Sequence, residues 1–378
     1  IFKRLTITPD GKNHGMMMFI DWSGSMSDKL TPTIHQLMNL VMFCRKVNIP
    51  YEVYAFSNSG RNGRYHGEPN IESKKPKYQP GDLTIDPYLK LINFASSRMT
   101  AKEHEEAMSN LYGVSIKYED YMGSRRFRRS YEVEENELWK SYVPDSPQGY
   151  GLSSTPLNCT IAAAMTMVPQ FQNRYSIDKM NTIFLTDGCS DGNEYVIISK
   201  EEAEEMQESK GYWGTDENNN YYTTFGYDDN IIIRNKSNKK NYLCSSRRDG
   251  MTESLLQALK DHTGTSLTGF FISGSKRIDR YTLDKYFPQY NYGGNEKVFD
   301  RKKVMAEFRK NKCLVVNDNT GYDEFYLLAG DDMKVTDGQM ATPSDNAKKG
   351  EIKRLFTQNL KSNRSSRIVM NKFITQVA

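Results

Sequence analysis

The stretch that most constrains the fold is residues 16–26, which read Met-Met-Met-Phe-Ile-Asp-Trp-Ser-Gly-Ser-Met. An unbroken apolar run that ends on a carboxylate is typical of a strand buried on both faces of a parallel sheet. The carboxylate is Asp21, and two hydroxyl residues, Ser23 and Ser25, follow it in a D-x-S-x-S pattern. Because open α/β sheets bind ligands at the carboxyl ends of their strands, the pattern predicts a site there. Oxygen ligands of mixed charge suit Mg²⁺ or Mn²⁺ better than zinc.

A loop rich in glycine and serine adds a third hydroxyl to the candidate site. Residues 149–160 read Gly-Tyr-Gly-Leu-Ser-Ser-Thr-Pro-Leu-Asn-Cys-Thr, so Thr155 stands directly before a proline. Proline is favoured at the first position of a helix because its missing N–H would be unpaired there anyway. Thr155 is therefore predicted to be the N-cap of a helix, with its hydroxyl free to face a ligand.

A second buried strand ends on a carboxylate at residues 182–188, Thr-Ile-Phe-Leu-Thr-Asp-Gly. The three segments, in this order, resemble the metal-ion-dependent adhesion site of von Willebrand factor A domains. That family's pattern is D-x-S-x-S, then a threonine in a G-x-T-P-L-like loop, then an aspartate at a T-D-G-like strand end. The resemblance implies that Mg²⁺ or Mn²⁺ is bound by the five matching residues, which are Asp21, Ser23, Ser25, Thr155 and Asp187. The alternative for the first segment alone is an Asx-turn that leads towards a helix from about Thr31.

The residues that follow the first motif narrow the resemblance. From Asp21 through a predicted helix to a strand at 51–57, the chain is similar to the C-terminal domain of CobT, the non-ATPase large subunit of cobaltochelatase. It most resembles the CobT-like proteins encoded by tailed bacteriophages, over roughly residues 14–58, 149–190 and 251–275. In that family the domain docks on a hexameric AAA+ ATPase, the CobS subunit. The long acidic segment of cobaltochelatase subunits does not precede the domain here, and since the chain starts at Ile1, we expect further residues upstream.

The length of 378 residues exceeds the roughly 250–300 at which single cores stop growing. The mean hydropathy of −0.71 indicates long polar insertions. We expect residues 1–335 to form one von Willebrand factor A-like domain with insertions at about 58–86, 113–148 and 190–250. Residues 336–378 are predicted to be a linker and an amphipathic helical arm that packs on the domain's own flank or, alternatively, binds a partner.

The alternation of apolar strands and amphipathic helices predicts an α/β fold with a doubly wound, mostly parallel sheet. The resemblance implies that this sheet is of the von Willebrand factor A or Rossmann-like type. The predicted strands of the sheet are 16–21, 51–57, 181–187, 267–273 and 313–317, and the insertion at 190–250 contains a strand-like stretch at 231–234. The predicted helices are 31–47, 87–98, 100–111, 156–172, 251–262, 276–287 and 300–311, of which the third opens with a Thr-Ala-Lys-Glu capping box.

Composition and missing motifs exclude several classes of function. Five scattered cysteines without a C-x-x-C pair favour a reducing compartment, and we expect a cytoplasmic protein, in the host cytoplasm if the chain is phage-encoded. No apolar run reaches the length of a membrane span. The five histidines lack zinc-hydrolase spacing, and the sequence has neither G-K-[ST] nor G-x-S-x-G. We therefore expect no ATPase, peptidase or other catalytic activity from the chain alone.

The basic-aromatic stretch at residues 125–131 is interpreted as a plain surface hairpin, with a protein contact or a nucleic-acid contact as alternatives. Acidic residues directly after it and a net charge of only +4 do not favour binding of nucleic acid.

The leading hypothesis for the whole chain is a metal-dependent adaptor. Its metal binds an acidic residue of a partner, and the resemblance implies a CobS- or MoxR-type AAA+ ATPase and an unknown client. The alternatives are a cobaltochelatase-like subunit that helps insert metal into a corrin ring, and a virion-associated or adhesion protein.

Overall fold

The structure is a computed structural model. It describes residues 13–58, 78–84, 89–128, 150–191, 195–208, 214–215, 220–223, 231–244, 250–273, 278, 282–283, 286–287, 300–311, 313–316 and 320–329. The predicted C-terminal arm at 336–378 lies outside this part of the chain, as do most of the predicted helix at 276–287 and most of the insertion at 58–86.

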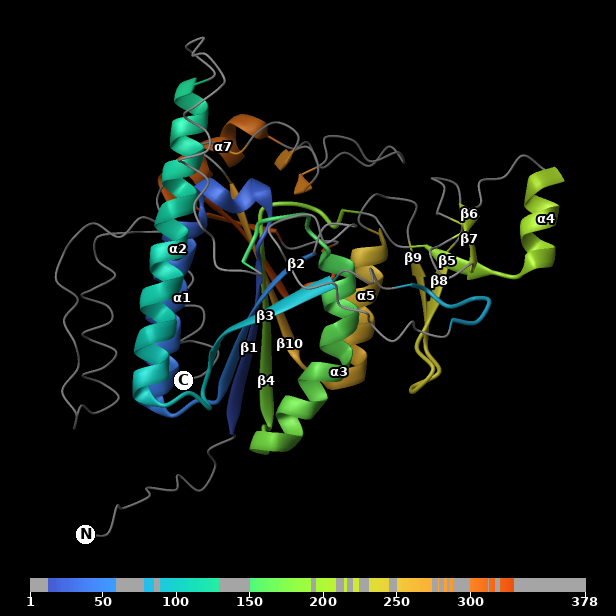
Figure 1. Ribbon diagram of the computed structural model, residues 1–378, viewed down its shortest axis with the longest axis horizontal. Helices are drawn as coiled ribbons and strands as arrows, with labels where there is room; N and C mark the ends of the chain where they lie inside the picture. Colours follow the sequence, from blue (N-terminus) through green and yellow to red (C-terminus); the bar gives the residue numbers. More distant parts are fainter. Residues whose placement is uncertain are drawn as a thin grey trace.

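A seven-stranded sheet of order β11-β12-β10-β4-β1-β2-β3 forms the centre of the molecule (Figure 1). Its strands are β1 (His14–Asp21), β2 (Tyr51–Asn58), β3 (Leu89–Ser96), β4 (Lys179–Thr186), β10 (Ser266–Ser273), β11 (Cys313–Val316) and β12 (Glu324–Ala329). The five inner strands are parallel, and the edge strands β3 and β11 are antiparallel to their neighbours. The prediction of a mostly parallel α/β sheet is confirmed.

The direction of chain winding reverses at β1. The chain first moves outward on one side through β2 and β3, and it later builds β4, β10 and β12 on the other side. The carboxyl ends of β1 and β4 therefore lie at a topological switch point, where open α/β sheets bind their ligands.

Helices cover both faces of the sheet (Figure 1). One face packs against α1 (Leu30–Val47) and α2 (Ala101–Arg128), and the other packs against α3 (Leu157–Tyr175) and α5 (Gly250–Thr263). The sequence of β1 is apolar because its successive side chains point alternately into two cores. Met16, Met18 and Ile20 belong to the core under α1 and α2, whereas Met17 and Phe19 belong to the core under α3 and α5.

Smaller elements lie around this core. The predicted insertion at 190–250 contains β5 (Val196–Ile198), α4 (Lys200–Glu208), β6 (Gly214–Thr215), β7 (Tyr221–Thr223), β8 (Ile231–Arg234) and β9 (Asn241–Cys244). Strands β8 and β9 form an antiparallel hairpin that contacts α5. Helix α7 (Arg301–Asn311) precedes β11 and contacts it, as the predicted order of helix and strand requires.

One predicted helix is wrong. Residues 87–98 were expected to be helical, but residues 89–96 form β3, which pairs antiparallel with β2 and has an irregular register beside Val53 and Tyr54. Apolar side chains of β3 reach both cores, since Leu91 packs with the α3 side and Phe94 with the α1 side. A strand covered on both faces carries no clean alternation, so its period could not be distinguished from that of a helix.

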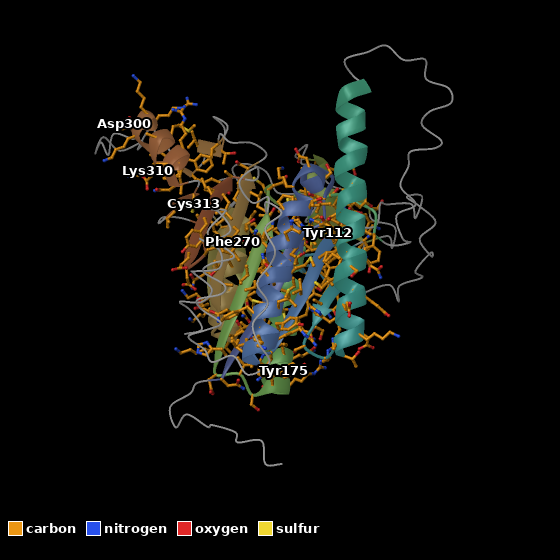
Figure 2. The ribbon with its side chains drawn as sticks, turned by 90° about the vertical axis from the view of Figure 1, so that its left-hand side faces the viewer. Tyr112, Tyr175, Phe270, Asp300, Lys310 and Cys313 are labelled. Atoms are coloured by element: carbon orange, nitrogen blue, oxygen red, sulfur yellow. The ribbon has the colours of Figure 1, made fainter. Side chains whose placement is uncertain are left out.

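The helix predicted at 100–111 is confirmed at its start. The backbone N–H of Thr100 donates to the Glu103 carboxylate at 2.8 Å, and the Thr100 hydroxyl accepts from the N–H of Glu103 at 3.3 Å. Helix α2 runs on to Arg128, and Figure 2 shows it lying along α1. Residues 125–128 are therefore helical rather than part of a surface hairpin. No described helix combines the length and the apolar character needed to cross a membrane.

Candidate metal site at the carboxyl edge of the sheet

Two carboxylates stand at the ends of the adjacent parallel strands β1 and β4. Asp21 is the last residue of β1 and is fully buried, and Asp187 directly follows β4 with its side chain only 2% exposed. The two strands pair in register up to Ile20 and Leu185, so their carboxyl ends meet at one edge. Two negative charges are thus held close together in a site with little access to water.

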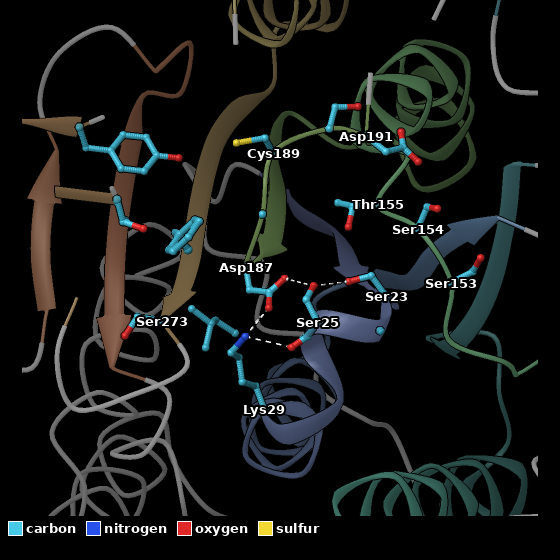
Figure 3. A pocket seen from close by; sticks show the side chains of 17 residues that line it. Ser23, Ser25, Lys29, Ser153, Ser154, Thr155, Asp187, Cys189, Asp191 and Ser273 are labelled. Carbon is cyan, nitrogen blue, oxygen red and sulfur yellow. Dashed lines mark hydrogen bonds and ion pairs between the residues drawn. The ribbon is translucent and has the colours of Figure 1, made fainter. Parts of the chain in front are cut away.

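Two serine hydroxyls extend this group of oxygen atoms. The Oγ atoms of Ser23 and Ser25 are 3.0 Å apart, and Ser25 Oγ donates to Asp187 Oδ1 at 2.8 Å (Figure 3). Both serines lie at the start of a 3-10 turn, Gly24–Asp28, in which the N–H of Met26 bonds back to the carbonyl of Ser23. This tight turn is the reason that hydroxyls two residues apart face the same point.

The carboxylate of Asp21 is only half satisfied. Its Oδ2 accepts a hydrogen bond from the Thr186 hydroxyl at 2.8 Å, whereas its buried Oδ1 has no hydrogen-bond partner among the described residues. Burial, followed by the charge of Asp187, raises the pKa of Asp21 to about 7, against the opposing effect of the Thr186 and Ser23 hydroxyls and the backbone of Asp187. A buried carboxylate oxygen without a hydrogen-bond partner calls for a physical explanation, and a bound cation is one such explanation.

Thr155 reaches the site from a different loop. That loop is fastened to the end of β1, since the N–H of Gly24 donates to the Ser153 carbonyl at 2.9 Å and the Trp22 indole donates to the Tyr150 carbonyl at 2.8 Å. The N–H of Asp191 in turn donates to the carbonyl of Thr155 at 3.0 Å. Three chain segments, far apart in sequence, are thereby fixed against one another.

The prediction that Thr155 is the N-cap of the helix is wrong by one residue. Helix α3 begins at Leu157, and Pro156 occupies the N-cap position with φ −79° and ψ 58°, without a side-chain capping bond. In the first turn the N–H of Asn158 instead donates to the Ser190 hydroxyl at 3.2 Å. The Thr155 side chain lines the same pocket as Asp187 (Figure 3).

A cavity of about 710 Å³ opens over these oxygens. It is lined by four of the five predicted residues, Ser23, Ser25, Thr155 and Asp187, and the fifth, Asp21, is buried at the adjoining strand end. Beyond them the wall continues over the end of β10 with Phe271, Ile272 and Ser273, and then Tyr286. The cavity is therefore polar on the β1 and β4 side and partly apolar on the β10 side.

Lys29 is a site residue that the sequence did not reveal. Its Nζ forms an ion pair with Asp187 Oδ2 and donates to the carbonyl of Ser25 at 3.0 Å (Figure 3). A more distant carboxylate, that of Asp28, lies 3.9 Å from the same nitrogen. In the sequence, only the spacing of four residues between Ser25 and Lys29 pointed to a contact of this lysine with the site. Its pairing with Asp187 spans 158 residues and depends on the fold.

The donor set suits a hard divalent cation. It consists of oxygen atoms only, from two carboxylates and three hydroxyls, and the unpartnered Asp21 Oδ1 provides an unused ligand. Within the described part of the chain, no three His, Cys, Asp or Glu side chains gather into a group that could hold a metal ion by itself. The oxygen-only donor set around Asp21 and Asp187 is of the kind that suits Mg²⁺ or Mn²⁺ better than zinc.

Comparison with known proteins gives little further guidance. No protein-family model and no curated protein matches the chain. The pilus adhesin SpaC from Lactobacillus rhamnosus GG, in its open conformation, is similar with a TM-score of 0.34 and 13% identity over 72% of this chain and 25% of the adhesin. A second crystal form of SpaC gives a TM-score of 0.33 and 12% identity over 70% of this chain and 25% of the adhesin. The chain spans about a quarter of the adhesin, and likeness this low carries no argument about fold or function.

Proposed function

We propose that this chain is a non-catalytic, metal-dependent adaptor of the von Willebrand factor A type. In this proposal Asp21, Ser23, Ser25, Thr155 and Asp187 hold Mg²⁺ or Mn²⁺ at the carboxyl edge of the sheet. When bound, the cation supplies a positive charge that a carboxylate of a partner protein can ligate. The partner is a CobS- or MoxR-type AAA+ ATPase, and the chain couples that ATPase to a client.

The observation that carries the proposal is the half-satisfied Asp21. A fully buried carboxylate beside a second carboxylate is unfavourable unless a cation or a set of donors compensates it. The Thr186 hydroxyl donates to Asp21 Oδ2, and the buried Oδ1 has no hydrogen-bond partner among the described residues. A divalent ion at this position would neutralise both acids at once, whereas a purely structural Asp21 would be expected to have donors on both oxygens.

The chain's own residues have distinct tasks in this proposal. Ser25 donates to Asp187 Oδ1 and so orients that carboxylate, and Ser23 continues the row of oxygens. Thr155 adds a hydroxyl from the opposite loop, which is fastened to β1 independently of the metal. Because these oxygens are already gathered, little rearrangement is needed for binding, which favours affinity.

The choice of an ATPase partner rests on the resemblance to CobT-like proteins. The order of the sheet, β3-β2-β1-β4-β10-β12 with β11 added at the edge, supports it only at the level of a doubly wound fold. Nothing in the described part of the chain favours a corrin-metal chelatase subunit or a virion-associated adhesion protein over the adaptor.

The test is complex formation between the full chain and a CobS- or MoxR-type ATPase encoded by the same genome. We expect a complex that is stable in Mg²⁺, dissociates in EDTA, and does not form with Asp187→Ala. Glu52→Gln is the matched control, because Glu52 is a buried acid far from the site, and this variant should bind like the wild type. A complex indifferent to EDTA and to Asp187→Ala would contradict the adaptor mechanism.

A further inference from the structure

Lys29 occupies an unusual place for a residue of a cation site. Its side chain is only 11% exposed, and its ammonium group is held between the Asp187 carboxylate and the carbonyl of Ser25. It approaches Asp187 from the side of α1, whereas Ser23 and Thr155 lie on the other side of that carboxylate (Figure 3). The five-residue metal pattern does not include this lysine.

The lysine changes the charge that a cation would meet. Asp21 and Asp187 together carry two negative charges when ionised, and Lys29 reduces the sum to one. Because both Lys29 and Asp187 are largely shielded from water, this interaction is weakly screened by salt. Lys29 therefore satisfies Asp187 before any metal arrives, and it repels a divalent ion that uses the same carboxylate.

We propose that Lys29 is a built-in counter-cation of the metal site, which stabilises Asp187 in the metal-free protein and lowers the affinity of the site for divalent ions. The inference rests on the proposed function, since it concerns the same site. Counted over a divalent ion, Lys29, Asp21 and Asp187 alone, the metal-bound site would carry one positive charge, which a partner's carboxylate would neutralise. By thermodynamic reciprocity, ion and acidic ligand would then strengthen each other's binding.

Two further acids near Lys29 contribute negative charge to the site. Asp28 lies 3.9 Å from the ammonium group, and Asp191 lines the same cavity. Both remain unchanged in variants of Lys29, so a comparison among such variants isolates the charge of this one residue. Lys29→Met keeps an unbranched side chain of similar length without the charge, and Lys29→Arg keeps the charge.

The experiment is a calorimetric Mn²⁺ titration of the full wild-type chain, Lys29→Met and Lys29→Arg, with thermal unfolding of each protein in EDTA. We expect Lys29→Met to bind Mn²⁺ about tenfold more tightly than the wild type, because a repulsive charge is removed. In EDTA the same variant should unfold at a lower temperature, because Asp187 becomes an unpaired buried charge. Lys29→Arg should stay close to the wild type in both measurements.

The outcomes separate this inference from the proposed function. If Lys29→Met binds Mn²⁺ as weakly as the wild type or more weakly, Lys29 only positions Asp187 and the inference is overturned. If the wild type binds no Mn²⁺ but Lys29→Met does, the counter-cation role is supported and the metal-dependent adaptor is not. If neither protein binds Mn²⁺ while the Lys29→Met fold is intact by near-UV circular dichroism, both are overturned. If Lys29→Met does not fold, tighter binding by the neutral Lys29→Gln variant is required in its place.

Discussion

Two buried carboxylates lie on the adjacent strands β2 and β1, near opposite ends of those strands. They differ in how completely their oxygens are hydrogen-bonded. Glu52, near the start of β2, is 2% exposed and accepts hydrogen bonds on both oxygens. Its donors are Ser96 Oγ at 2.9 Å, Arg98 Nε at 3.0 Å and Asn93 Nδ2 at 3.0 Å. Asp21, at the end of β1, is fully buried; Thr186 donates to its Oδ2, and its Oδ1 has no hydrogen-bond partner among the described residues.

Under the proposed function, the difference distinguishes an acid that stabilises the fold, Glu52, from one that binds a cation, Asp21. The donors of Glu52 compensate its burial, so its charge contributes to stability through hydrogen bonds that cross from β2 to β3 and the turn after it. Asp21 lacks such compensation and faces a second acid, Asp187. Incomplete satisfaction of a buried charge is typical of functional sites, where binding supplies what the fold does not.

The largest effect on stability should come from breaking the satisfied acid. Glu52→Gln places an amide nitrogen where Arg98 and Asn93 donate, and we expect a loss of about 2–3 kcal/mol in the free energy of unfolding. The loss is moderated because the Arg98 side chain is 53% exposed and can be solvated. Urea unfolding monitored by circular dichroism measures it. A change below about 0.5 kcal/mol would mean that the network around Glu52 is dispensable.

The next effect concerns the hydroxyl that donates to Asp21 Oδ2. The Thr186 hydroxyl donates to Asp21 and accepts from the N–H of Gly188 at 3.1 Å. Thr186→Val removes both bonds with little change in volume, and we expect a loss of about 1–2 kcal/mol in EDTA. Thr186→Ser keeps the hydroxyl and serves as the control. Equal losses in the two variants would assign the effect to packing of the methyl group instead.

Unlike Glu52→Gln, Asp21→Asn should not lower the free energy of unfolding. Without metal, the substitution removes a fully buried charge beside Asp187, so we expect stability to be unchanged or to rise by about 1 kcal/mol. The measurement is urea unfolding in EDTA, with Glu52→Gln unfolded in parallel. A loss as large as that of Glu52→Gln would remove the distinction between the two acids.

The smallest effect should come from an exposed ion pair. Lys102 and Glu106 lie 3.9 Å apart on α2, with side chains 86% and 62% exposed. Such pairs are screened by water and salt, so Lys102→Met should leave the urea midpoint unchanged within error. A clear shift would show that the assay responds to surface charge in general, and the comparison of buried acids would then need a salt series.

The sequence was most informative where burial and chemistry coincide in one segment. The apolar runs of β1 and β4 predict strands covered on both faces, and the carboxylates that end them predict the sheet edge at which Asp21 and Asp187 meet. The hydroxyls of Ser23 and Ser25 follow from the same local pattern, because the turn that positions them is short.

Features that depend on distant contacts could not be predicted. Strand β3 has apolar residues for two cores, so its periodicity did not identify it, and β12, which pairs with β10 and β11, was not anticipated. Lys29 pairs with a residue 158 positions away, and only the folded chain brings the two together. The missing donor of Asp21 is likewise a property of packing.

The most direct test of the metal site is a calorimetric Mn²⁺ titration of the wild type, Asp21→Asn and Glu52→Gln. We predict one ion per wild-type chain, an affinity at least about 100-fold weaker in Asp21→Asn, and an unchanged affinity in Glu52→Gln. Thermal unfolding should agree, since an ion at about 100 times its dissociation constant stabilises the folded state by about 2.7 kcal/mol. Equal Mn²⁺ affinity in the wild type and Asp21→Asn would contradict a metal site at the carboxyl edge of this sheet.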